Sequence, residues 1–149
     1  MATTGAYNRF KRNLAAGAVN LASADVRVLL VSSSYTFSSD HNFVSDITNE
    51  LSGTGYARKV LASKVVAEDD ANDRATFDAD DLVWTGANFG TPDAAIVYVH
   101  NAADAAAELI CCLNLTTKVA TNGGDFTATF DAVGGLRIGS CARSATAPA

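Results

Sequence analysis

Short apolar segments with alternating side chains, separated by turn-forming residues, recur along most of this chain. Residues 26–31, 93–100, 108–115 and 126–130 have this character. A period of two places successive side chains on opposite faces of a β-strand. Many short strands with few helical segments predict a mainly β fold, an antiparallel β-sandwich or barrel with one N-terminal helix. A mixed α+β sheet is the runner-up, because the alanine-rich residues 101–108 can form a helical turn.

The helical pattern lies at residues 7–21, where apolar side chains recur at the spacing of one helical face. Gly17 weakens this helix midway, because glycine costs up to about 1 kcal/mol relative to alanine. Two interpretations remain open. The helix either packs on its own sheet with its basic face in water, or it docks on an acidic neighbour. The interface candidates named by the docking interpretation are Tyr7, Arg9, Phe10, Lys11, Arg12 and Leu14.

Length and charge restrict the domain organisation and the partners. A chain of 149 residues favours one domain, which we expect over residues 1–140, with a flexible C-terminal tail over 141–149. The net charge of −5 argues against a nucleic-acid partner. No apolar run approaches the roughly 20 residues of a membrane helix, so no membrane partner is expected either. The N-terminus lacks the pattern of a signal peptide, which predicts synthesis in the cytoplasm.

The candidate catalytic and metal-binding residues do not match the spacing of any known catalytic or metal-binding motif. His41 and His100 lack the spacing of a metal-binding pair. The acidic residues between 68 and 81 are dense enough for Ca²⁺ to be considered, but their spacing does not fit an EF-hand, and turn capping explains them. The 3 cysteines fit free thiols, and the adjacent Cys111 and Cys112 should point to opposite faces of a strand. We therefore predict no enzyme, no metal site and no cofactor.

A pair of aromatic residues encloses a run of aspartates at residues 77–84. The sequence there reads Phe77-Asp78-Ala79-Asp80-Asp81-Leu82-Val83-Trp84. We expect a hairpin with the aspartates in its turn and both aromatic side chains buried, because aspartate stabilises turns by bonding to nearby backbone. Core packing is the default for Trp84. An exposed Trp84 would instead indicate a sugar or protein interface.

Four motifs follow one another in a recognisable order. They are Tyr7-Asn8-Arg9-Phe10-Lys11, Leu29-Leu30-Val31-Ser32-Ser33-Ser34-Tyr35, Gly53-Thr54-Gly55-Tyr56 preceded by Ser45-Asp46, and residues 77–84. In this order they resemble a family of small tailed-phage virion proteins, over roughly residues 7–139. The chain departs from that family after Tyr56, where Ala57-Arg58-Lys59 replaces a glycine-rich stretch that often stands there.

The resemblance implies a structural component of the virion, made in the host cytoplasm. The favoured role is a capsid decoration or cement protein that bridges capsid subunits. Its partners would be the major capsid protein or other virion proteins, and a homo-oligomer is expected. The alternative is a head or tail fibre module that binds host surface carbohydrate. Such a module should present a shallow groove with exposed aromatic side chains.

Overall fold

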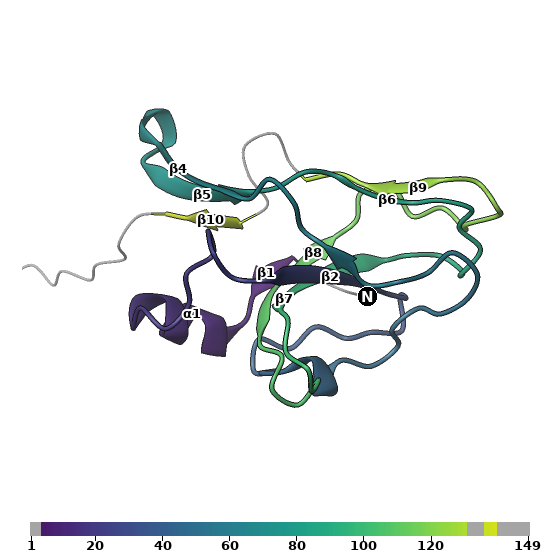
Figure 1. Ribbon diagram of the computed structural model, residues 1–149, viewed down its shortest axis with the longest axis horizontal. Helices are drawn as coiled ribbons and strands as arrows, with labels where there is room; N and C mark the ends of the chain where they lie inside the picture. The colour runs from purple at the N-terminus through teal and green to yellow at the C-terminus, as the bar shows by residue number, and fades with distance from the viewer. Residues whose placement is uncertain (1–3, 131–135, 140–149) are drawn as a thin grey trace, which may run out of the picture.

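The computed structural model describes residues 4–130 and 136–139, and it is mainly β. One α-helix lies near the N-terminus, and the paired strands run antiparallel (Figure 1). The mainly β fold with one N-terminal helix is therefore confirmed. Residues 101–108 form bends and turns rather than a helix, so the α+β runner-up was wrong. The expected tail at 141–149 and Cys141 lie outside the described residues.

The largest sheet has five strands in the order β1-β8-β7-β2-β3. Its central strands are the three longest apolar runs, β2 (Val26–Val31), β7 (Ala94–Val99) and β8 (Leu109–Asn114). Very short strands close its edges, β1 (Gly5–Ala6) beside β8 and β3 (Lys59–Val60) beside β2. Short edge strands leave little backbone free for unwanted pairing.

The central strands are buried on both faces, which explains their nearly continuous apolar sequence. Val28 and Leu30 of β2 pack in one hydrophobic cluster, and Leu29 and Val31 pack in another on the opposite face. Cys111 and its neighbour Cys112 divide between the same two clusters, as predicted for adjacent residues of a strand. Both faces of the sheet therefore need covering layers.

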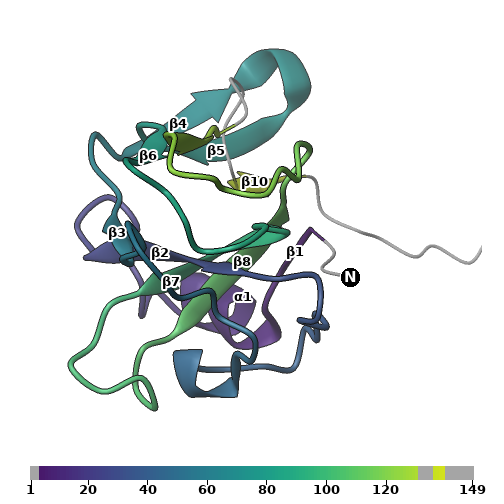
Figure 2. The same cartoon turned by 90° about the vertical axis from the view of Figure 1, so that its right-hand side faces the viewer.

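Two smaller sheets form the layer over one face (Figure 2). One pairs β6 (Leu82–Trp84) with β9 (Phe126–Ala128). The other has the order β10-β5-β4, with β10 at Leu136–Ile138, β5 at Arg74–Asp78 and β4 at Val65–Asp69. The 3-10 helix η2 (Asp70–Asn72) lies between β4 and β5. In Figure 1 the hairpin of β4 and β5 reaches beyond the body of the molecule.

The expected hairpin at residues 77–84 is wrong, although its aromatic residues are buried as predicted. Phe77 belongs to β5 and Trp84 to β6, and these strands pair in different sheets. The intervening aspartates make a corner that carries the chain from one sheet to the other. Both rings point into the same hydrophobic cluster, which is why the sequence pattern alone resembles that of a hairpin.

The helix α1 spans Asn8–Ala15 and is shorter than the expected 7–21. Gly17 ends it, with φ of +71°, instead of weakening it midway. The Ala18 N–H donates to the Asn13 carbonyl and the Gly17 N–H to the Leu14 carbonyl, the two bonds of a Schellman C-cap.

A single turn of 3-10 helix, η1, occurs at Val44–Asp46. The side chain of Ser45 does not cap this turn. The carboxylate of Asp46 instead accepts the backbone N–H groups of Asn42 and Phe43. A carboxylate can satisfy two free donors at a helix start, whereas a hydroxyl usually satisfies one.

Candidate functional site

The apolar side of α1 packs inside this chain. Tyr7 is 0% exposed, Phe10 is 1% exposed, and Leu14 packs against the same cluster as Phe10. Tyr7 and Phe10 therefore cannot contact a partner in this conformation, and their assignment as interface candidates was wrong. The helix packs on its own sheet with its basic residues outward, which is the first of the two interpretations left open by the sequence.

The basic residues of α1 differ in what they contact. The Arg9 guanidinium forms an ion pair with Glu108 at 3.6 Å and lies 4.6 Å from the centre of the Phe43 ring. Lys11 and Arg12 are exposed, and their hydrogen-bond partners are the neutral amides of Asn8 and Asn13. Among the described residues, neither Lys11 nor Arg12 forms an ion pair. These two residues are the free cations of the helix surface.

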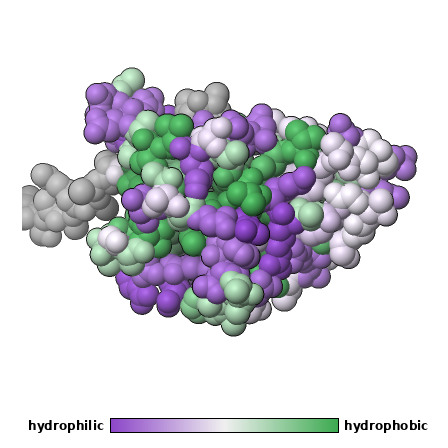
Figure 3. All heavy atoms as spheres, viewed as in Figure 1, coloured by the Kyte–Doolittle hydropathy of each residue, from purple (hydrophilic) through white to green (hydrophobic). Residues whose placement is uncertain are grey.

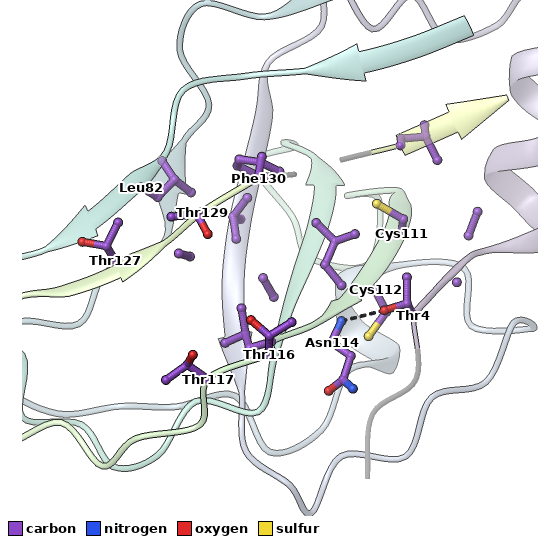
Figure 4. Close-up of a pocket in the computed structure, with 18 of the residues that line it drawn as sticks. Thr4, Leu82, Cys111, Cys112, Asn114, Thr116, Thr117, Thr127, Thr129 and Phe130 are labelled. Atoms are coloured by element: carbon purple, nitrogen blue, oxygen red, sulfur yellow. Dashed lines mark hydrogen bonds between the residues drawn. The ribbon is translucent and has the colours of Figure 1, made fainter. Parts of the chain in front are cut away.

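A cavity of about 650 Å³ lies between β8 and β9. Figure 4 shows side chains from both strands at its wall, with threonine hydroxyls beside apolar groups. Its apolar lining includes Leu82, Phe126, Phe130 and Leu136. Its ionisable lining residues are Cys111, Cys112 and Arg137. Burial raises the pKa of each thiol to about 12, so both are neutral near pH 7 and are poor nucleophiles.

Arg58 holds two loops together through paired carboxylates. It donates to both oxygens of Glu50, at 2.8 and 2.7 Å, and to both oxygens of Asp104, at 2.8 and 3.1 Å. The hydroxyl of Tyr56 donates to Glu50 at 2.7 Å and accepts the N–H of Leu30. Hydrogen bonding from Arg58 lowers the pKa of Asp104. Arg58 therefore has a structural role, which sequence reasoning missed.

A second polar cluster is formed by Tyr7, Tyr35 and His41. The hydroxyls of Tyr7 and Tyr35 are 2.9 Å apart, and the Tyr35 hydroxyl lies 3.1 Å from Nδ1 of His41. Burial raises the pKa of Tyr7, and it raises the pKa of Tyr35 to about 12. The cluster connects the start of α1 to the loop after β2.

Three of the acidic residues between 68 and 81 stabilise local structure. Asp69 forms an ion pair with Arg74 at 2.7 Å across the β4–β5 pair. Asp80 accepts the Ser63 hydroxyl, and Asp81 accepts the backbone N–H of Phe130. In residues 4–130 and 136–139, no group of three or more histidine, cysteine or acidic residues is placed to hold a metal ion. No helix in that part of the chain is long and apolar enough to cross a membrane.

The small sheet exposes aliphatic side chains at its edge. Val65 and Val66 of β4 are 54% and 53% exposed, and Ile138 of β10 is 45% exposed. Within the described part of the chain, β4 pairs only with β5, so its outer backbone edge has no strand partner. In Figure 3 the projecting hairpin has a hydrophilic tip, and hydrophobic surface lies beside it. Exposed apolar side chains on an unpaired strand are typical of protein interfaces.

Comparisons with protein families, with curated proteins and with solved structures found no match to this chain.

Proposed function

We propose that this chain is a structural protein of a tailed-phage virion that decorates the capsid and bridges its subunits. The order of the sequence motifs supports the virion. The observation that carries capsid attachment is the outer face of α1, where Lys11 and Arg12 have no acidic partner among the described residues, in a chain of net charge −5. Two unneutralised cations on a rigid helix would attract an acidic shell surface.

Aromatic exposure favours attachment over carbohydrate binding. Each of the 12 aromatic residues (7 Phe, 4 Tyr and 1 Trp) lies in the described part of the chain, and each is buried or only partly exposed. Trp84, the residue best suited to stack on a sugar, is 0% exposed. No fully exposed aromatic ring therefore supports the fibre module, which is kept as an outcome of the test.

The test measures binding of purified protein to undecorated capsids. The variant Lys11→Gln/Arg12→Gln removes two positive charges from exposed side chains and leaves the buried side of α1 intact. Its matched control, Thr85→Glu/Asn88→Glu, lowers the net charge equally at two exposed residues after β6. Arg9 is left unchanged because it contacts Glu108 and Phe43.

We expect saturable wild-type binding that weakens as salt rises, because exposed charges are screened. The glutamine variant should bind more weakly than the control, while both melt near the wild-type temperature. Equal binding by the two variants would remove α1 from the interface. No wild-type binding to any capsid form, together with retention on a host glycan array, would replace decoration by the fibre function.

A further inference from the structure

We propose that β4 pairs antiparallel with β4 of a second copy of this chain, about a two-fold axis at Val66. Such a contact would join two three-stranded sheets into one continuous six-stranded sheet. It goes beyond capsid attachment and does not depend on it, because self-association is measured in purified protein. The proposal starts from the unpaired edge of β4 and from the order of residues along it.

The two sides of β4 are set by its register with β5. Val66 lies opposite Phe77, whose ring is buried, so Val66 is on the side of the sheet that faces the body. Lys64 and Glu68 stand two residues before and after Val66, and therefore lie on the same side. Val65 and Ala67 lie on the other side. The strand thus has an aliphatic centre, with a cation at one end and an anion at the other.

That order is self-complementary. In an antiparallel pair centred on Val66, each Lys64 lies opposite Glu68 of the second copy, so two opposite-charge pairs form. The valines meet at the centre, and Val65 lies opposite Ala67. Opposite charges directly across an antiparallel pair are stabilising, and aliphatic pairs pack well on the same face. A two-fold contact requires such self-complementarity, because the same strand forms both sides of the interface: if residue i of one copy contacts residue j of the other, residue j also contacts residue i.

The neighbouring registers lack these pairs. Residues that lie directly opposite each other in an antiparallel pair have their side chains on the same face of the sheet. The two-fold axis must therefore pass through a residue of β4, and the neighbouring registers are those centred on Val65 and on Ala67. A centre at Val65 places Lys64 opposite Val66. A centre at Ala67 places Val66 opposite Glu68 and Val65 opposite Asp69. Asp69 already forms an ion pair with Arg74 at 2.7 Å, so placing it opposite Val65 adds no favourable charge pair.

The length of the contact is limited at both ends. Ser63, with φ of +53°, turns the chain away from extended geometry before Lys64, and η2 begins at Asp70. Lys64 also donates from its ammonium group to the Ala24 carbonyl, which holds the start of the strand against the body. The ammonium has three donors, so this bond leaves others for Glu68 of the second copy. A contact of this length should give a reversible, concentration-dependent dimer.

The decisive experiment is disulfide trapping in full-length protein carrying Cys141→Ser. The native Cys111 and Cys112 are buried and remain in place. Val66→Cys places a thiol at the two-fold axis, where opposed Cα atoms are about 4.5–5.5 Å apart, within disulfide range. Val65→Cys is the matched control, because Val65 is equally exposed but lies off the axis and on the opposite side. We expect mild oxidation to give covalent dimer at least ten-fold faster for Val66→Cys than for Val65→Cys.

Charge exchange gives a second, independent readout. In sedimentation experiments Glu68→Lys should shift the dimer to monomer, because two lysines then oppose each other at each end. The double variant Lys64→Glu/Glu68→Lys should restore the dimer, since the exchanged pairs are again complementary. Melting curves would check that each variant is folded. A wild-type protein that stays monomeric at millimolar concentration, or equal trapping rates at positions 65 and 66, would overturn the proposal.

Discussion

The indole Nε1–H of Trp84 donates a hydrogen bond of 2.7 Å to the backbone carbonyl of Ala57. This bond joins β6 to the segment that follows Gly53-Thr54-Gly55-Tyr56. Trp84 is 0% exposed and packs beside the Phe126 ring of β9, with ring centres 5.9 Å apart. One side chain therefore holds the second layer to the loops around the large sheet.

Trp84→Ala should destabilise the protein by about 3–5 kcal/mol, through lost burial and the cavity left behind. Trp84→Phe should cost less, because most of the apolar contact remains while the Ala57 carbonyl loses its donor. Chemical denaturation measures both. The control is Val83→Ala on the exposed side of β6, for which a change within about 0.5 kcal/mol is expected. A loss below about 1 kcal/mol for Trp84→Ala would contradict the packing role.

A comparison of Gly55 with Gly86 measures how much stability is lost when a side chain meets closely packed backbone. Both have positive φ, +78° and +58°. A Cβ at Gly55 would lie 2.7 Å from the Gly86 carbonyl oxygen, whereas a Cβ at Gly86 would meet nothing within 4 Å. Alanine at either site should cost about 1–2 kcal/mol for the left-handed conformation. We expect Gly55→Ala to lower the melting temperature clearly more than Gly86→Ala, and equal shifts would show that the neighbouring backbone moves freely.

Asp46 should make stability depend on acid pH. The backbone N–H groups of Asn42 and Phe43 donate to its carboxylate and lower its pKa below the ordinary 3.8. A lowered folded-state pKa contributes stability that is present above the unfolded pKa and is lost as pH falls through the folded value. The free energy of unfolding of Asp46→Asn should therefore fall less steeply below about pH 4 than that of wild type. Urea titrations across this range test it, with Ser45→Ala in the same turn as the control.

The thiols of Cys111 and Cys112 should be unreactive in the folded protein. They are 4% and 0% exposed, and burial raises the pKa of each to about 12. In a Cys141→Ser background, Ellman's reagent at neutral pH should label the native protein only at the rate of unfolding. Both thiols should react at once in denaturant. Rapid labelling of the native protein would show that the cavity beside β8 admits reagent.

Local sequence was sufficient for the strands of the large sheet. The runs that became β2, β7 and β8 are apolar on both faces, and such segments have few alternatives to a buried strand. The same reasoning predicted the burial of Trp84 and the division of Cys111 and Cys112 between two clusters. In each case the property depends on a few residues that are neighbours in the sequence, so it can be predicted from periodicity and composition.

The partners of α1 and of residues 77–84 were decided by the tertiary structure. An apolar stripe shows that one side of a helix must be buried, but it does not show whether the burying surface is the chain's own sheet or another protein. Tyr7 is buried beside Tyr35, which lies 28 residues away in the sequence, and their hydroxyls form a hydrogen bond. Likewise, a turn between two buried aromatics is compatible with a hairpin or with a corner between sheets.

The contrast between Arg9 and Lys11 has the same origin. Both are cations on one short helix, and the sequence determined that each would tend to lie near the surface. Only the fold brings Glu108, 99 residues beyond Arg9, within 3.6 Å of its guanidinium and leaves Lys11 with a neutral partner. Sequence thus determined the central strands of the large sheet and the burial of Phe77 and Trp84, because these are local properties. The pairing of strands, the partner of each charge and the exposed edge of β4 depend on contacts between distant segments, and only the tertiary structure supplies those.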